Sequence, residues 1–358
     1  FGIAISGTHG KTTTTSLIVQ IMTEAKLDPT YIIGGIINAT GMNAKLGKSD
    51  YLIAEADESD ASFLHLQPML SVITNIDEDH MSTYSHNYDN LTDAFIKFTS
   101  NLPFYGICVA CIDDNGVKDI LKKIHRPVLS YGFSENADVK ASNIQQNELR
   151  MTFDVNCSKY DKKFPVILNL IGNHNILNAL AAITVAIELE IKIKDIQKAL
   201  LNFSGVSRRL DFHQYLSINV YKVPLFDDYG HHPNEISAVV SSLRSTYPDK
   251  RLLVIFQPHR YSRTRDLFND FVSCLSKVDA LVLLNIYSAN EAPINTVSSS
   301  TLADSIRRRS SIDPIVVKNI DEIIEILPNI ASEDDVILTL GAGDVHKIPH
   351  QLKDHFSK

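Results

Sequence analysis

Near its start the chain carries a run of glycine, lysine and threonine residues that could bind phosphate. The run reads Gly7, Thr8, His9, Gly10, Lys11, Thr12 and Thr13. Glycines let backbone N–H groups turn toward an anion, and a following helix N-terminus adds positive potential. The Lys11 ammonium would reach the outer phosphates of a nucleotide, and the Thr12 hydroxyl would hold Mg²⁺. The spacing, G-x-x-G-K-T, is shorter than the common P-loop, but a threonine-rich helix cap does not explain so many suitable residues in succession.

Acidic segments follow the next two apolar runs, at residues 55–60 (EADESD) and 75–80 (NIDEDH). Because ligands gather at the carboxyl ends of parallel strands, Glu55 or Asp57 would lie near the phosphate-binding run, where a carboxylate suits Mg²⁺. The alternative for the first segment is a solvated acidic turn. His80 is an unusual ligand for Mg²⁺, which prefers oxygen, and taken alone it is more typical of a helix cap or a core residue.

The second half of the chain holds two further segments with reactive residue types. Residues 227–233 (DDYGHHP) contain two histidines, which could form a metal pair, but the proline and the acids fit a ligand-binding loop equally well. Residues 259–265 (HRYSRTR) contain three arginines, which could grip carboxylate or phosphate groups bidentately or form a solvated basic face. They are Arg260, Arg263 and Arg265. The run at 307–309 (RRR) closes a predicted helix and reads as surface.

The elements that must position these residues alternate between strand and helix. Phe1–Ile5 reads as a short buried strand and Lys11–Lys26 as a helix with one apolar face. Residues 137–170 instead show short alternating strands, which predicts an antiparallel addition. The pattern breaks near 202–209, and a second alternation follows, including a helix predicted over Thr264–Ser276.

These alternations predict an α/β fold in two domains. We expect residues 1–206 to form a P-loop-type ATP-binding domain with a mostly parallel sheet and a small antiparallel addition. We expect residues 207–358 to form a Rossmann-like α/β domain that binds an amino acid. Because no residues precede the first predicted strand, we expect this sequence to be a fragment that starts at a domain boundary.

Composition limits the class of protein. The 358 residues are 44% hydrophobic and 21% charged, which is typical of a folded globular protein. A net charge of −8 disfavours a protein that coats nucleic acid, although a local basic cleft could still bind a small anion. We therefore expect no nucleic-acid partner and a monomer or weak homodimer.

Neither a long apolar run nor a signal-peptide pattern is present, so we expect no membrane partner and a cytoplasmic protein. Four cysteines do not make a disulfide framework in a chain of this length, which fits a reducing compartment. Cys108 and Cys111 form one C-x-x-C pair, read here as part of a buried strand, since a zinc site would need a second pair.

Six motifs in order resemble those of the Mur ligases, the ATP-dependent ligases of bacterial cell-wall synthesis. They are the phosphate-binding run, residues 55–60, residues 79–81 (DHM), residues 172–178 (GNHNILN), residues 207–212 (SRRLDF) and residues 227–233. The resemblance extends from residue 1 to about residue 348. It implies a family of three domains, of which this chain would lack the N-terminal one that binds the UDP-sugar.

The resemblance also implies roles for individual residues. Lys11 and Thr12 would contact the outer phosphates of ATP, and Thr12, Glu55 and His80 would bind Mg²⁺. The adenine would meet His174, Asn175 and Asn178, while Arg209 would reach the phosphates and Asp228 the ribose. L-Alanine and an acyl phosphate would be positioned by His231, Arg260 and Arg263, which with Lys11 form the expected catalytic set.

The reaction implied is the ATP-dependent joining of L-alanine to UDP-N-acetylmuramate through an acyl phosphate, in peptidoglycan precursor synthesis. Within the family, a ligase that recycles murein tripeptide is the nearest alternative. An ATPase or kinase without amide synthesis, and a nucleotide-binding fragment without turnover, are the others.

Overall fold

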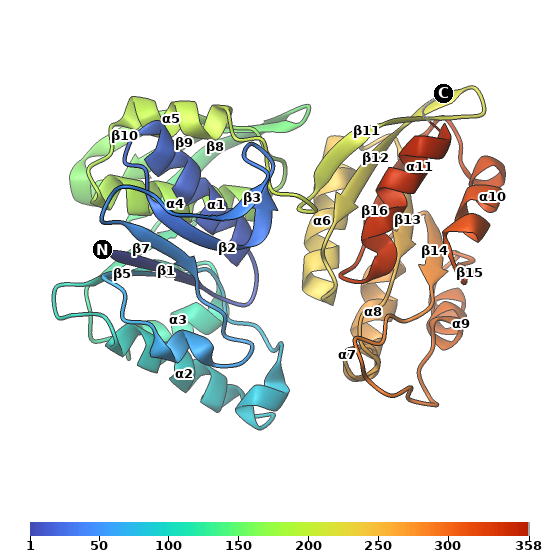
Figure 1. Cartoon of the computed structure of the whole chain (residues 1–358), viewed down its shortest axis with the longest axis horizontal. Helices are drawn as coiled ribbons and strands as arrows, with labels where there is room; N and C mark the ends of the chain where they lie inside the picture. The colour runs from blue at the N-terminus through green and yellow to red at the C-terminus, as the bar shows by residue number, and fades with distance from the viewer. Residues whose placement is uncertain (357–358) are drawn as a thin grey trace. The chain divides into compact units, whose positions relative to one another are not determined.

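The computed structural model describes residues 1–356 and divides into two compact units, Phe1–Ser207 and the chain from Arg208 onward. Each unit is a sheet with helices on both faces, so the predicted α/β fold class is confirmed (Figure 1). Helices cover both faces of each mostly parallel sheet, and the apolar side chains of strands and helices meet to form the core of each unit.

The first unit is built on a ten-stranded sheet in the order β10-β9-β8-β7-β6-β5-β1-β4-β2-β3. Strands from β2 to β8 in this order pair in parallel, while β9 and β10 pair antiparallel, as the pattern of 137–170 predicts. The edge strand β3 is also antiparallel, which was not predicted. The strands are β1 (Gly2–Ser6), β2 (Thr30–Ile37), β3 (Met42–Lys45), β4 (Leu52–Glu55), β5 (Leu70–Ile73), β6 (Ile107–Cys111), β7 (Val128–Gly132), β8 (Val139–Asn147), β9 (Arg150–Cys157) and β10 (Lys162–Leu168).

Three helices of this unit pack together on one face of the sheet and two cover the other (Figure 1). The first group is α1 (Lys11–Glu24), α4 (Asn173–Glu188) and α5 (Ile193–Leu201), and the second is α2 (Tyr88–Ser100) and α3 (Asn115–Leu121). Short 3₁₀ turns are η1 (Ser62–His65), η2 (Met81–Tyr84) and η3 (Ser158–Tyr160). Helix α1 ends two residues earlier than predicted, because Lys26 takes a left-handed conformation with φ 63°.

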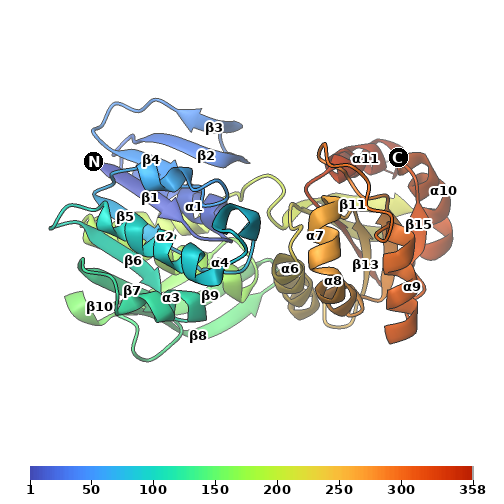
Figure 2. The same ribbon diagram turned by 90° about the horizontal axis from the view of Figure 1, so that it is seen from below.

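The second unit has a six-stranded sheet in the order β11-β12-β16-β13-β14-β15, in which only β11 is antiparallel (Figure 2). Its strands are β11 (Asp211–Ile218), β12 (Tyr221–Asp228), β13 (Arg251–Phe256), β14 (Ala280–Leu284), β15 (Ile315–Val317) and β16 (Asp335–Leu340). Its helices are α6 (Pro233–Thr246), α7 (Tyr261–Asp266), α8 (Phe268–Leu275), α9 (Ser299–Arg309), α10 (Ile320–Ile330), α11 (Ile348–Phe356) and the turn η4 (Asp344–Lys347). The single helix expected over Thr264–Ser276 is wrong: α7 and α8 are separate, with a break at Leu267.

The parallel strands explain why the candidate residues gather. Strands β1, β4 and β5 are neighbours, so the loops after them open at one edge of the first sheet. The same holds for β12, β16, β13 and β14 in the second sheet. Each unit therefore carries one set of loops at the carboxyl ends of its strands.

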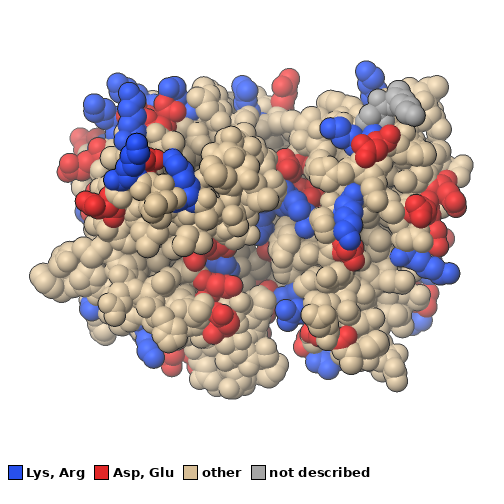
Figure 3. Space-filling view, viewed as in Figure 1, with Lys and Arg blue, Asp and Glu red and all other residues tan. Residues whose placement is uncertain are grey.

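Charges of both signs mix on the surface (Figure 3), and the cysteines lie in the interior. Figure 3 shows Lys and Arg side chains interspersed with Asp and Glu side chains on the viewed face of each unit. The cysteines are free and buried, and Cys108 and Cys111 lie in β6 as the strand interpretation predicts. Over residues 1–356, no helix combines the length and the apolar character needed to cross a bilayer.

Candidate functional site

The phosphate-binding run forms a turn between β1 and α1, and two of its glycines cannot be replaced without a clash. Gly7 has φ 134° and Gly10 has φ 81°, a region that L side chains rarely adopt. A Cβ on Gly7 would lie 2.0 Å from Thr74 Oγ1, and one on Gly10 would lie 2.4 Å from Asn178 Oδ1. Gly10 caps α1 without a side-chain hydrogen bond, so the first N–H groups of the helix suit an anion.

The segment after β5 holds this loop in shape. Asn75 Oδ1 accepts from the His9 backbone N–H at 2.7 Å, and Asn75 Nδ2 donates to the His9 carbonyl at 2.9 Å. The Thr8 hydroxyl accepts from the Asp77 N–H at 2.9 Å, and the His9 ring Nε2 lies 3.2 Å from Asp77 Oδ2. Asn75 begins the second acidic segment identified from the sequence, but it was not selected there as a site residue.

Lys11 is folded back onto its own loop. Its Nζ donates to the Gly7 carbonyl at 2.6 Å, the Thr8 carbonyl at 3.2 Å and Glu58 Oε2 at 2.8 Å, which uses all three ammonium hydrogens. Glu58 is only 2% exposed, and this burial raises the pKa of its carboxyl although Lys11 opposes the shift. A phosphate group must therefore replace some of these partners of Lys11. Glu58 belongs to the acidic segment identified from the sequence, but it was not selected there.

Glu55 lies beside Thr12, as the strand-end argument predicts. The Thr12 hydroxyl donates to Glu55 Oε1 at 3.0 Å, and the Gly34 N–H donates to Glu55 Oε2 at 2.7 Å. A hydroxyl and a carboxylate side by side form a set of oxygen donors of the kind that Mg²⁺ prefers. Asp57, the other candidate in this segment, accepts from the Ser59 N–H at 2.9 Å.

His80 is the N-cap residue that precedes the turn η2, with φ 53°, and its Nε2 lies 3.5 Å from Asp79 Oδ2. The position thus fits the helix-cap alternative as well as a ligand role, and its predicted contact with Mg²⁺ stays a prediction.

The start of α4 packs against the phosphate-binding loop. Asn178 is buried, and its Oδ1 accepts from the Thr14 hydroxyl at 3.3 Å while its Nδ2 donates to Asn175 Oδ1 at 3.1 Å. Asn175 Nδ2 in turn donates to the Ile171 carbonyl at 2.8 Å. Both asparagines therefore brace the loop, and His174, half-buried in the first turn of α4, lies next to them in sequence. Their contact with adenine stays a prediction.

In the second unit, Asp228 ends β12 and is held by backbone groups. Its two carboxylate oxygens accept from the Leu210 and Gly230 N–H groups, each at 2.6 Å. Burial raises the pKa of Asp228 to about 7, against the opposing effect of Arg209. The Arg209 guanidinium carbon lies 5.1 Å from the centre of the Tyr229 ring, within range of a cation–π interaction.

The two histidines of 227–233 lie at the entry to α6. Glu235 Oε2 accepts from the His231 N–H at 3.0 Å and the His232 N–H at 3.2 Å, and Pro233 occupies the first turn. This is a capping box, which fixes the loop that carries His231. His231 Nδ1 lies 3.1 Å from the Tyr229 carbonyl oxygen.

Around Arg263 a second cluster forms at the ends of β13 and β14. Arg263 is buried and its Nη1 lies 3.4 Å from His259 Nδ1, and the His259 ring stacks on Tyr287 with centroids 5.4 Å apart. The His231 ring is 5.7 Å from that of His259. Burial, together with His231 and the two neighbouring arginines, lowers the pKa of His259 to about 4, so this imidazole is neutral near pH 7.

The structure separates the three arginines predicted as a grip. Arg260 is exposed and precedes α7 as its N-cap residue, while Arg263 lies in the cluster. Arg265 instead lies on the surface, where its Nε donates to Asp266 Oδ1 at 2.7 Å. His259 begins the segment 259–265 identified from the sequence, but it was not selected there as a site residue. Tyr287 carries no sequence signal and was missed.

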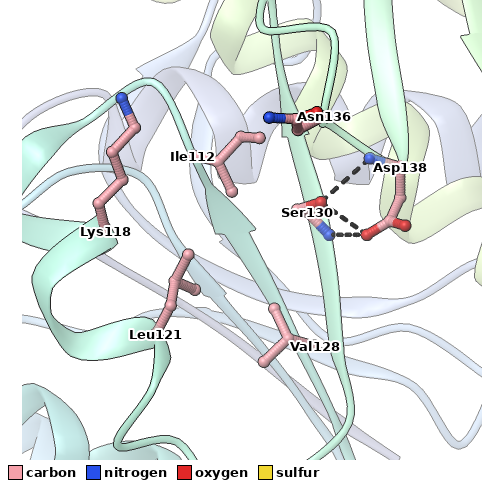
Figure 4. Close-up of a pocket in the computed structure, with 7 residues that line it drawn as sticks. All are labelled: Ile112, Lys118, Leu121, Val128, Ser130, Asn136 and Asp138. Carbon is pink, nitrogen blue, oxygen red and sulfur yellow. Dashed lines mark hydrogen bonds between the residues drawn. The ribbon is translucent and has the colours of Figure 1, made fainter.

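An open groove of about 460 Å³ lies elsewhere in the first unit, between α3, β7 and the loop before β8 (Figure 4). Its lining residues are Ile112, Lys118, Leu121, Val128, Ser130, Asn136 and Asp138, none of which is a predicted site residue. The Ser130 hydroxyl donates to Asp138 Oδ2 at 2.6 Å and closes one wall.

Two protein-family models match most of the chain. The family described as Mur ligase middle domain matches residues 5–186, and the family described as Mur ligase, glutamate ligase domain, matches residues 209–343.

Individual proteins of known name are also similar. A protein named UDP-N-acetylmuramate–L-alanine ligase from Vesicomyosocius okutanii is 64% identical over 357 residues, covering 100% of this chain and 76% of the relative. One of the same name from Hydrogenovibrio crunogenus is 52% identical, covering 99% and 76%. This chain thus spans about three quarters of the length of these relatives.

Solved structures agree on the fold. The crystal structure of UDP-N-acetylmuramate–alanine ligase MurC from Thermotoga maritima matches with a TM-score of 0.82 at 24% identity, over 99% of this chain and 75% of that one. A MurF ligase from the same organism, in complex with ADP, matches with a TM-score of 0.75 at 17% identity, over 99% and 80%.

Proposed function

The chain belongs to the Mur ligase family, and on that premise we propose that it uses ATP to join L-alanine to UDP-N-acetylmuramate in peptidoglycan precursor synthesis. The observation that carries this proposal is the 64% identity over 357 residues to a ligase named for this reaction. The two clusters support it, since one has the groups to bind a triphosphate and the other the groups to bind a carboxylate.

The reaction proceeds in two transfers. The carboxylate oxygen of the muramoyl group attacks the γ-phosphorus of ATP, ADP leaves, and an acyl phosphate forms. The amine of L-alanine then attacks the acyl carbon, phosphate leaves, and the nitrogen loses a proton. ATP is needed because a carboxylate is a poor electrophile. The protein contributes mainly positioning and charge neutralisation.

In the first unit, the Lys11 ammonium and the N–H groups at the start of α1 offset the negative charge of the phosphates. Thr12 and Glu55 would hold Mg²⁺, with His80 as a third candidate ligand, and the adjacent oxygens of Thr12 and Glu55 fit that ion. Mg²⁺ supplies further charge compensation on the triphosphate when it is bound. His174, Asn175 and Asn178 are the proposed adenine contacts.

In the second unit, His231, Arg260 and Arg263 are proposed to position L-alanine and the acyl phosphate, and neutral His259 adds a hydrogen-bond acceptor beside them. Arg209 and Asp228 are the proposed contacts to the phosphates and ribose. We place the reaction in the cytoplasm, since the thiols are unpaired and such thiols persist in reducing compartments.

The test is phosphate release with each of the twenty amino acids, with and without UDP-N-acetylmuramate. We expect release only when L-alanine and the nucleotide sugar are both present. Release that needs neither would indicate an ATPase, and release with murein tripeptide in place of alanine would indicate a recycling ligase. Binding of ATP without any release would indicate a nucleotide-binding fragment.

A further inference from the structure

We propose that the glycine pair Gly34-Gly35 in β2 is a positioning element that presets Glu55 and Thr12 for a divalent cation. The proposal deepens the Mg²⁺–ATP assignment and rests on it. Neither glycine carries a reactive group. They act on the site because they lack a Cβ and because the Gly34 backbone N–H donates a hydrogen bond.

The pair lies where β2 departs from regular pairing. Strand β2 pairs in parallel with β4 through Ile32 and with the edge strand β3 at Ile32 and again at Ile37, with a shift of register between these two positions. Bulges of this kind redirect backbone groups and are common next to active sites. Here the irregular stretch follows directly on the β2 pairing with β4, the strand that ends at Glu55.

One redirected group is the Gly34 N–H, which donates to Glu55 Oε2 at 2.7 Å. The other carboxylate oxygen, Oε1, accepts from the Thr12 hydroxyl at 3.0 Å. The Glu55 carboxylate is thus fixed by one donor on each oxygen, and one of these donors belongs to the rigid backbone. Such outer contacts orient a metal ligand before the ion arrives.

Space is the reason that both positions are glycine. A Cβ on Gly34 would lie 3.0 Å from Glu55 Oε2 and 3.1 Å from Oε1. A Cβ on Gly35 would lie 2.7 Å from Thr12 Cγ2, its closest contact, and 3.1 Å from Val206 Cγ1. Neither glycine is among those with positive φ, so the backbone conformation itself does not require them. Each glycine therefore makes room for one of the two proposed Mg²⁺ ligands.

The experiment is calorimetric binding of a non-hydrolysable ATP analogue at a series of Mg²⁺ concentrations, for Gly34→Ala and Gly35→Ala. Loss of an outer contact to a metal site typically weakens the metal by roughly 10- to 100-fold. We expect the Mg²⁺ concentration for half-maximal binding to rise about tenfold in each variant, while metal-free binding of the analogue changes less than about twofold.

Two further variants separate this effect from a general loss of structure. Gly2→Ala is the matched control, since its Cβ would come no closer than 3.4 Å to a neighbour, and we expect wild-type Mg²⁺ dependence. Adding Thr12→Ser to Gly35→Ala removes the methyl group that clashes but keeps the hydroxyl, and we expect it to restore most of the Mg²⁺ dependence. A destabilised fold would not be restored in this way.

Each remaining outcome decides the matter. Wild-type Mg²⁺ dependence in Gly34→Ala and Gly35→Ala overturns the proposal and leaves the ATP assignment standing. An equal loss in Gly2→Ala, or no recovery with Thr12→Ser, also overturns it. Absence of Mg²⁺-dependent binding in the unmodified protein overturns the Mg²⁺–ATP assignment and this proposal together.

Discussion

At the scale of single residues, the contact between Lys11 and Glu58 governs the phosphate-binding loop. A carboxylate that is 2% exposed beside the lysine meant for phosphate is electrostatically unfavourable for a triphosphate. The ion pair is therefore a competitor of ATP in the nucleotide-free protein. The sequence places an acidic segment at this strand end, but it does not show which carboxylate meets Lys11, since that depends on how the segment turns.

We predict that Glu58→Gln lowers the stability of the nucleotide-free protein by roughly 3 kcal/mol, because it removes the counter-ion of a largely buried ammonium. Mg²⁺–ATP should then raise the melting temperature more in the variant than in the wild type, since the phosphates replace the missing charge. Thermal melting with and without nucleotide measures this. Glu78→Gln, at an exposed acid, is the control, and an equal nucleotide-induced shift in wild type and Glu58→Gln would contradict the prediction.

Asp228 gives a prediction for pH. Its pKa rises from 3.8 to about 7 on folding, so between these values the folded protein holds a proton that the unfolded chain has lost. This contribution to stability is present at low pH and is lost as the pH rises through 7, with a slope of at most about 1.4 kcal/mol per pH unit. We expect the difference in melting temperature between wild type and Asp228→Asn to shift in favour of the variant as pH rises from 4 to 7.

The control for this series is Asp249→Asn, at an exposed carboxylate, whose difference from wild type should stay constant over the same range. A constant difference for Asp228→Asn as well would show that folding does not raise the pKa of Asp228.

At the scale of elements, strand ends were predictable and breaks within helices were not. The alternation of apolar runs placed β1, β4 and β5, and hence brought Glu55 to Thr12. The break falls at Leu267, whose φ of −108° and ψ of 24° are not helical, and no glycine or proline in the sequence marks it. His259 and Tyr287 meet only because β13 and β14 are neighbours, and strand order cannot be read from periodicity.

The entry to α6 offers a prediction at this scale. Glu235 accepts from two backbone N–H groups that precede the helix, so Glu235→Ala should cost about 1 kcal/mol of stability and loosen the loop that carries His231. We expect the KM for L-alanine to rise severalfold while the KM for ATP changes little, as steady-state kinetics can measure. Glu325→Ala, at an exposed position on α10, should change neither value, and an unchanged alanine KM in Glu235→Ala would refute the link.

At the scale of the whole molecule, the phosphate-binding loop and the histidine–arginine cluster belong to different units, while Arg209 and Asp228, the proposed contacts to the phosphates and ribose, lie in the second. The groups around the phosphate-binding loop all lie in residues 1–207, and the histidine–arginine cluster lies after residue 208. We therefore expect that a substitution in one set leaves the fold of the other unit intact. The family resemblance predicted an ATP-binding and an amino-acid-binding domain, whereas composition alone indicated only a folded globular protein.

Arg260→Ala tests this separation. We expect the KM for L-alanine to rise or kcat to fall by roughly 10²-fold, the usual cost of removing one charge-stabilising donor. The affinity for an ATP analogue should stay within about twofold of wild type. Arg265→Ala, in which the lost side chain is bonded to Asp266 on the surface, is the matched control. A parallel loss of ATP affinity in Arg260→Ala would count against the assignment.

The burial of the free thiols has a consequence for handling the protein. Burial raises the pKa of Cys108 and of Cys274 to about 12, which keeps both sulfurs as unreactive thiols at neutral pH. Alkylating reagents can reach them only when the chain opens locally. Cys274 sits in the second unit and Cys108, Cys111 and Cys157 in the first. The alkylation rate of each cysteine therefore measures how often the unit that contains it opens, separately for the two units.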